Sequence, residues 1–181
     1  MLALKNLVTL KDKQFKPYIS SEQILEGVKK VAGQINSDLA GESPVFLAVL
    51  NGSFMFASDL MKEIQISCEI SFVKLASYHG TTSSGTVSEL IGLSQDISGR
   101  IVVIVEDIVD TGNTLEKLAE ILEAKKVKDY KVAAAFFKPS AYTKQIKVDY
   151  VGLEIPNDFV VGYGLDYDGL GRNLKDVYVL A

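Results

Sequence analysis

The 181-residue chain is short of the residues that build disulfides and metal clusters, with one cysteine and one histidine. The single Cys68 excludes a disulfide within the chain, and the lack of a Cys/His cluster argues against a zinc site. Long hydrophobic runs are missing as well, so we expect neither a signal peptide nor a membrane span. The cytoplasm is therefore the expected location.

Charge of one sign is nowhere concentrated. The 19 Lys and Arg residues stand against 23 Asp and Glu residues, for a net charge of −4, and no block of five like charges occurs. A general nucleic-acid surface would need a basic face. We therefore expect small-molecule partners and no binding to nucleic acid or membranes.

Hydrophobic residues, in contrast, are plentiful, at 48% of the chain. A chain of this length and composition suits one domain with a full core. No internal repeat, linker or low-complexity tract divides it, so we expect residues 1–181 to form a single domain.

The apolar patterns predict alternating strands and helices. A capping box at residues 20–23 should begin a helix, and another helix should follow residue 53. Strands are expected at residues 45–50, 69–76, 87–93, 101–105, 132–137, 148–153 and 177–180. Repeated strand-helix order implies a mostly parallel sheet covered by helices, with ligands at the carboxyl ends of its strands.

The most informative stretch is residues 102–114, which read VVIVEDIVDTGNT. Its first half is apolar and β-branched, as in a strand covered on both faces. After Gly112 the apolar residues recur at helical spacing, so residues 110–114 should form the turn between a strand and a helix. Backbone N–H groups are free at the start of a helix, and this turn therefore suits an anion.

Three carboxylates, those of Glu106, Asp107 and Asp110, accompany this expected anion site. Carboxylates and a phosphate repel each other unless a cation or a sugar lies between them, so the pattern predicts a phosphorylated sugar bound with a metal ion. Glu106 and Asp107 would hold a ribose diol and Mg²⁺. Asp110 is available as a general base or as a partner for a cationic group, or, considered alone, it is the N-cap of the helix. The expected phosphate-binding residues are Thr111, Gly112, Asn113 and Thr114.

The block at residues 102–114 resembles the phosphoribosyl pyrophosphate binding motif of type I phosphoribosyltransferases. The rest of the chain resembles the hypoxanthine-guanine members of that family, in residues 50–56, Ser77-Tyr78, Lys138, residues 158–167 and Arg172. The resemblance implies an α/β fold with a mostly parallel twisted sheet flanked by helices, a small hood and a flexible lid loop. It also implies Mg²⁺ as cofactor and a homodimer or homotetramer.

The implied reaction transfers 5-phosphoribose from phosphoribosyl pyrophosphate to a purine nitrogen and releases pyrophosphate. By resemblance, Asp110 accepts the proton from the purine ring. Lys138 would donate to the 6-oxo group of hypoxanthine or guanine, and Phe159 would stack on the base. The backbone of Val160 would read the edge of the base. Asp166 would lie near the base through its backbone and bind Mg²⁺, together with Glu106 and Asp107, through its side chain.

The pyrophosphate and lid residues also follow from the resemblance. Asn51 and Gly52 would present backbone N–H groups to pyrophosphate, next to a strained Leu50–Asn51 peptide bond, and Arg172 would bind the anion directly. Many relatives have a basic residue in place of Asn51, so this chain departs from the pattern there. Ser77 and Tyr78, in the loop of residues 77–85, would close over the reacting groups.

Two alternatives accompany the enzyme hypothesis. A regulator with the same fold could sense phosphoribosyl pyrophosphate and bind nucleic acid, but the absence of a basic surface pattern and the presence of Lys138 and Phe159 favour the enzyme. A second alternative keeps the reaction and changes the preferred base to xanthine. The position-2 substituent is read largely by backbone groups, so the residue pattern leaves this choice open.

Overall fold

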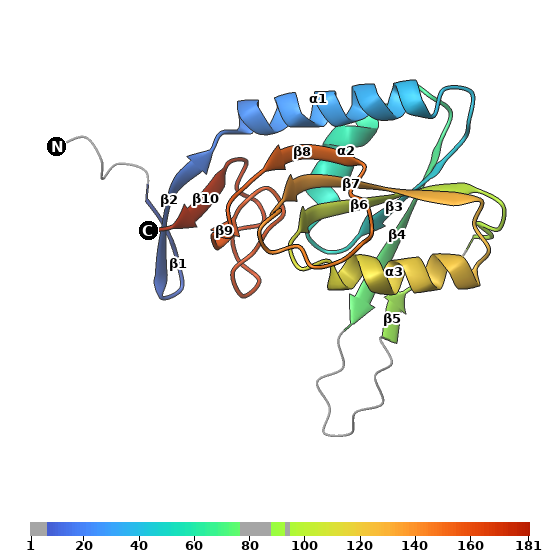
Figure 1. Ribbon diagram of the computed structural model, residues 1–181. Helices are drawn as coiled ribbons and strands as arrows, with labels where there is room; N and C mark the ends of the chain where they lie inside the picture. The colour runs from blue at the N-terminus through green and yellow to red at the C-terminus, as the bar shows by residue number, and fades with distance from the viewer. Residues whose placement is uncertain (1–6, 77–87, 93–94) are drawn as a thin grey trace.

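A six-stranded sheet runs through the middle of the computed structural model, which describes residues 7–76, 88–92 and 95–181 (Figure 1). Its order is β5-β4-β3-β6-β7-β8. Five neighbouring strands, β4, β3, β6, β7 and β8, run parallel, and β5 pairs antiparallel with β4 at one edge. The strands are β3 (Val45–Val49), β4 (Glu69–Ala76), β5 (Ser88–Ile91), β6 (Ile101–Val109), β7 (Asp129–Phe137) and β8 (Tyr150–Glu154). The mostly parallel α/β sheet is thus confirmed.

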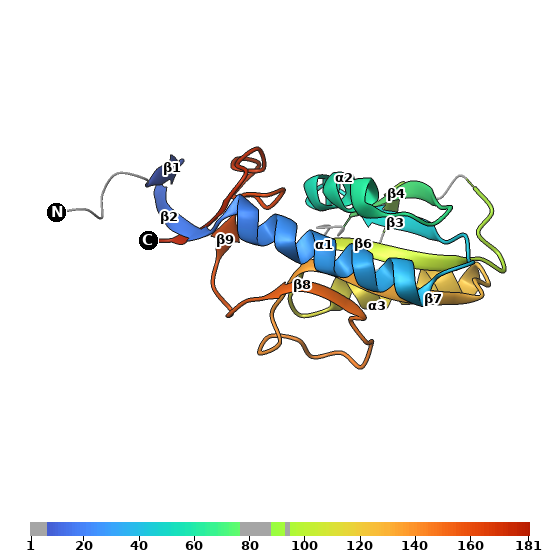
Figure 2. The same cartoon turned by 90° about the horizontal axis from the view of Figure 1, so that it is seen from above.

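Helices cover both faces of this sheet (Figures 1 and 2). On one face, α1 (Ser21–Asp38) and α2 (Phe54–Glu63) share a core with Val103 and Val105 of β6. On the other, α3 (Asn113–Ala124) packs with Val102 and Ile104. Side chains alternate between the two faces of a strand, and both faces of β6 are covered, so β6 is continuously apolar from Ile101 to Val105.

The capping box predicted at the start of α1 is confirmed. The Ser20 hydroxyl accepts a hydrogen bond from the Gln23 N–H at 3.3 Å, and the Gln23 side chain accepts one from the Ser20 N–H at 3.0 Å. No helix in the described part of the chain is long and apolar enough to cross a membrane.

Strand β6 is longer than the sequence pattern indicated. We expected residues 101–105, but the strand continues to Val109 because β7 pairs with it as far as Val109↔Phe137. Glu106 and Asp107 therefore lie within the strand and not in the turn after it. The change to polar residues therefore does not mark the end of the strand, and buried Val109 follows them in the core.

A second, four-stranded antiparallel sheet forms the hood, and Figure 1 shows it beside the ends of β6, β7 and β8. Its order is β1-β2-β10-β9, so it joins both ends of the described chain. The β1–β2 hairpin was not anticipated from the sequence. The expected lid residues Ser77 and Tyr78 lie outside the described residues. The hood strands are β1 (Val8–Leu10), β2 (Lys13–Ile19), β9 (Val160–Val161) and β10 (Val177–Leu180).

Candidate active site

The turn between β6 and α3 depends on Gly112, which is the N-cap of α3 and has a φ of 87°. A Cβ atom there would lie 2.5 Å from Tyr142 Cε2, so both the backbone conformation and the space favour glycine. No side chain caps the helix. The alternative in which Asp110 is the N-cap is therefore wrong, because the left-handed turn starts the helix two residues later.

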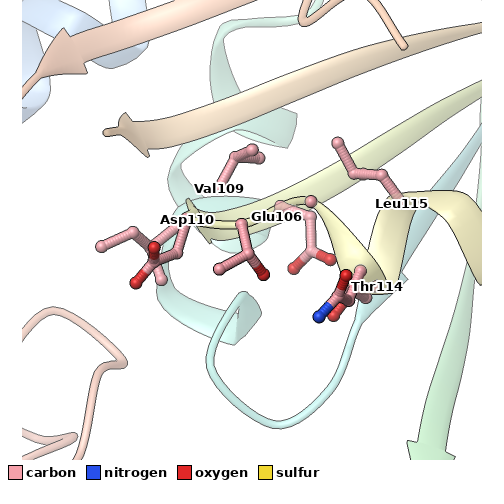
Figure 3. Close-up of a pocket in the computed structure, with 9 residues that line it drawn as sticks. Glu106, Val109, Asp110, Thr114 and Leu115 are labelled. Atoms are coloured by element: carbon pink, nitrogen blue, oxygen red, sulfur yellow. The ribbon is translucent and has the colours of Figure 1, made fainter. Parts of the chain in front are cut away.

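A small cavity of about 80 Å³ lies in front of this turn. Its lining contains all four residues expected to bind phosphate, and Figure 3 shows Glu106, Asp110 and Thr114 around it. The first backbone N–H groups of α3 have no partner within the helix, and the positive end of its dipole lies here. The cavity lining is Glu106, Ile108, Val109, Asp110, Thr111, Gly112, Asn113, Thr114 and Leu115.

A larger cavity of about 280 Å³ adjoins the first. It brings together the residues to which the resemblance gave the purine base, from the ends of β6 and β7 and from the C-terminal loops. The two cavities share Ile108 and Asp110, so Asp110 lies where they meet. The lining of the larger cavity is Asp107, Ile108, Asp110, Lys138, Phe159, Val160, Leu165 and Asp166.

Glu106 and Asp107 line different cavities, because consecutive residues of a strand point to opposite faces. Glu106 is buried at the smaller cavity, and burial, followed by the charge of Asp107, raises its pKa well above the ordinary value. Burial also raises the pKa of Asp107 to about 6, although the Ile108 N–H donates to its carboxylate at 2.8 Å. Both carboxyls thus bind a proton more readily than in water.

Lys138 contacts the candidate general base. Its backbone N–H donates to the Val109 carbonyl at 3.0 Å, which places Lys138 beside the end of β6. Its Nζ lies 3.3 Å from Asp110 Oδ2, and the side chain is only 8% exposed. A lysine this buried needs a partner, and Asp110 supplies it.

Gly52 lies against Asp107 so closely that a Cβ atom on it would be 2.5 Å from Asp107 Cγ. The carbonyl of Gly52 is packed in turn against Gly164, whose φ is 96°. In the same loop as Gly52, the peptide bond between Leu50 and Asn51 is cis. The predicted pyrophosphate loop is therefore in direct contact with a carboxylate of the larger cavity.

Arg172 is engaged by its own loop. Its Nη1 donates to the Gly164 carbonyl at 2.7 Å, and its Nη2 lies 2.6 Å from Asp166 Oδ1. The other oxygen of Asp166 accepts from the Gly169 N–H at 2.7 Å. Arg172 lines neither cavity, so in this structure it holds Asp166 rather than facing the space for an anion.

Residues 19–168 of the chain match the protein family described as a phosphoribosyl transferase domain. The chain belongs to the phosphoribosyltransferase family. It is 41% identical over 166 residues to a hypoxanthine-guanine phosphoribosyltransferase from Streptococcus pneumoniae, covering 91% of this chain and 92% of that protein. The homologous enzyme from Streptococcus agalactiae is 43% identical over 162 residues, 89% of this chain and 90% of the relative.

Solved structures of phosphoribosyltransferases have the same fold. A hypoxanthine-guanine phosphoribosyltransferase from Bacillus anthracis superposes with a TM-score of 0.84 at 38% identity, covering 92% of this chain and 96% of that chain. The match confirms the fold expected from the resemblance, with its parallel sheet and flanking helices.

The three carboxylates expected to hold Mg²⁺ do not gather at one place, because Glu106 lines the smaller cavity whereas Asp107 and Asp166 line the larger one. Among the residues that the structure describes, no three His, Cys, Asp or Glu side chains gather closely enough to hold a metal ion. Asp107 and Asp166 do line one cavity. One or two carboxylates suit Mg²⁺, because it keeps several waters and takes further oxygens from a substrate phosphate.

Residues far along the chain support the turn between β6 and α3 in this phosphoribosyltransferase, and they were not expected from the sequence. The backbone N–H and the hydroxyl of Thr143 both donate to the Thr111 carbonyl, at 3.4 and 3.2 Å. Lys144 pairs with Glu116 of α3 at 2.8 Å. These residues follow β7 and are about 30 positions from the turn, and no local pattern reveals such a contact.

Proposed function

We propose that this phosphoribosyltransferase transfers 5-phosphoribose from phosphoribosyl pyrophosphate to hypoxanthine and guanine, forming IMP and GMP. The two adjoining cavities that meet at Asp110 carry the proposal. The smaller one lies at a helix start and suits a 5′-phosphate. The larger one combines a buried cation with an aromatic ring and suits a planar oxopurine. A sugar spanning both would place its reactive carbon near the junction.

The larger cavity supports a preference for 6-oxopurines. The Lys138 ammonium only donates hydrogen bonds, so it can pair with the O6 of hypoxanthine or guanine but meets the 6-amino group of adenine donor to donor. Phe159 is 47% exposed and lines the cavity, where it can stack on the base. The backbone of Val160 and that of Asp166 would read the edge of the base.

Asp110 is assigned as the general base. It borders both cavities and would accept the proton released from the purine ring nitrogen as the new bond to the sugar forms. When the base occupies the cavity, Lys138 would donate to both O6 and Asp110. That shared donor would fix the carboxylate near the reacting nitrogen.

Mg²⁺ is the proposed cofactor. Asp107 and Asp166 would hold it from the larger cavity, directly or through water, while Glu106, which lines the smaller cavity, would hold the ribose diol. When bound, the ion would neutralise charge on the leaving pyrophosphate. The backbone N–H groups of Asn51 and Gly52 would bind the same group. Direct binding of the anion by Arg172, which the resemblance implies, would require its guanidinium to turn from Gly164 and Asp166, because Arg172 lines neither cavity here.

Ser77 and Tyr78 would close over the site as a lid and exclude water. The protein would work in the cytoplasm. It would form a homodimer or homotetramer, and light scattering after size-exclusion chromatography would measure this oligomeric state. A nucleic-acid-binding regulator is disfavoured by the net charge of −4.

The decisive experiment incubates the protein with phosphoribosyl pyrophosphate, Mg²⁺ and each purine separately, and identifies the nucleotide products by mass. We expect IMP and GMP, no AMP, and no product in excess chelator. A strong preference for xanthine would change the assigned base but not the reaction. Failure to form any nucleotide would refute the proposal.

A pair of matched variants tests Asp110 in the same assay. Asp110→Asn should lower kcat by about 10²-fold, within the range of general-base catalysis. Asp129→Asn makes the same change at the first residue of β7, far along the strand from Lys138, and should leave kcat unchanged. Equal kcat in the two variants would remove Asp110 from the mechanism.

A further inference from the structure

Three aromatic rings form a cluster behind the larger cavity. Phe159, whose ring is the proposed stacking surface, meets Tyr167 edge to face at 5.9 Å between centroids and 87°. Phe15 of β2 lies 6.2 Å from Phe159 and 6.1 Å from Tyr167, and it is fully buried. Phe159 thus lines the cavity and also packs against Phe15 of the hood and Tyr167 of the loop between β9 and β10.

Tyr167 is held in turn by the β1–β2 hairpin. Its hydroxyl donates to Asp12 at 2.7 Å, and the Lys13 ammonium lies 5.3 Å from the centre of its ring. The hydrogen bond raises the pKa of Tyr167 and lowers that of Asp12. Next to Tyr167, Asp168 forms an ion pair with Lys11 of the same hairpin turn. Contacts separated by more than 150 residues therefore fix this ring.

A stacking residue contributes more to affinity when its ring plane is defined before the ligand arrives, because less conformational freedom is lost on binding. An edge-to-face contact restricts rotation of the Phe159 ring about its χ2 torsion. A shift of Tyr167 would thus disturb the base-binding wall and leave the phosphate turn, which belongs to β6 and α3, in place.

We propose that Tyr167, anchored by Asp12 of the β1–β2 hairpin, is a positioning residue that sets the orientation of Phe159 for the purine. Neither Tyr167 nor Asp12 lines either cavity of the site, so both act through Phe159 and not on the substrate. The assignment rests on the proposed function. It gives the hairpin, the part of the fold that the sequence pattern did not show, a role in base affinity.

The test compares steady-state constants of Tyr167→Leu and Tyr167→Phe with those of the unchanged protein. Tyr167→Leu removes the ring and should raise the KM for hypoxanthine roughly three- to tenfold, the size expected for one aromatic pair. Tyr167→Phe keeps the ring and should have a smaller effect in the same direction. The KM for phosphoribosyl pyrophosphate should stay within twofold. The control is Tyr18→Phe, which removes a hydroxyl from β2 outside the cluster.

Asp12 variants separate positioning from a general loss of stability. Asp12→Asn keeps an acceptor for the Tyr167 hydroxyl and should retain the KM for hypoxanthine, whereas Asp12→Ala should match Tyr167→Phe. The double variant Tyr167→Phe, Asp12→Ala should be no worse than either single one. A KM for hypoxanthine that does not change in Tyr167→Leu, or rises equally for both substrates, would overturn the inference while the proposed function stands. Absence of nucleotide product from the unchanged protein would overturn both.

Discussion

Replacing Gly52 by alanine should disturb one carboxylate and little else. The φ of Gly52 is not positive, so an alanine can adopt its backbone conformation. The added Cβ, however, would lie 2.5 Å from Asp107 Cγ and overlap a carboxylate oxygen. Asp107 would have to move within a packed strand and leave the Ile108 N–H that donates to it at 2.8 Å.

The expected cost is that of overfilling a packed interior, about 1–3 kcal/mol. For a protein of this size each kcal/mol lowers Tm by roughly 2–4 °C, so Gly52→Ala should melt several degrees below the unchanged protein. Gly33→Ala is the matched control. Gly33 is exposed within α1 and a Cβ there would meet nothing within 4 Å, so this change should raise stability by about 0.5–1 kcal/mol.

A double-mutant cycle isolates the overlap. In an Asp107→Ala background the carboxylate is gone, and Gly52→Ala should then cost less than about 0.5 kcal/mol. Urea unfolding of the four proteins, without ligands, gives the coupling free energy. If Gly52→Ala destabilised both backgrounds equally, the contact between Gly52 and Asp107 would not be the reason that glycine is needed.

Three other predictions follow from the site. Burial raises the pKa of Asp107 from 3.8 to about 6, so the folded protein binds a proton there more tightly than the unfolded chain, and stability should fall as pH rises between these values. Asp107→Asn should remove a cost of about 3 kcal/mol at pH 7.5 and make the fall in stability shallower, with the contribution of buried Glu106 remaining, as measured by urea unfolding; a profile as steep as before would contradict the assignment. In the unchanged protein the ratio of kcat/KM for hypoxanthine to kcat/KM for adenine should be on the order of 10³. Lys138→Gln offers an acceptor as well as a donor, so this ratio should become smaller; an unchanged ratio would show that Lys138 does not read the base. Thr143→Val loses the hydroxyl bond to Thr111 and should raise the KM for phosphoribosyl pyrophosphate more than that for the base; equal changes would make this contact merely structural.

Local patterns determined the elements whose cause is local. The Ser20 capping box, the continuous apolar run of β6 and the helical spacing after Gly112 each depend on residues within a few positions of one another. The same holds for the phosphate turn, whose four predicted residues line one cavity. The resemblance added the residues of the base site, and the structure brings Lys138, Phe159, Val160 and Asp166 together with Asp110.

Only the tertiary structure decided how these parts meet. Pairing with β7 extends β6 to Val109, beyond the strand expected from the sequence, so Glu106 and Asp107 lie in a strand and line different cavities. The left-handed turn makes Gly112 the N-cap, so Asp110 does not cap the helix and pairs with Lys138 instead. Tyr167 and Asp12 are 155 positions apart, yet they share a hydrogen bond behind Phe159. Such contacts depend on where distant strands come to lie, which no pattern of neighbouring residues encodes.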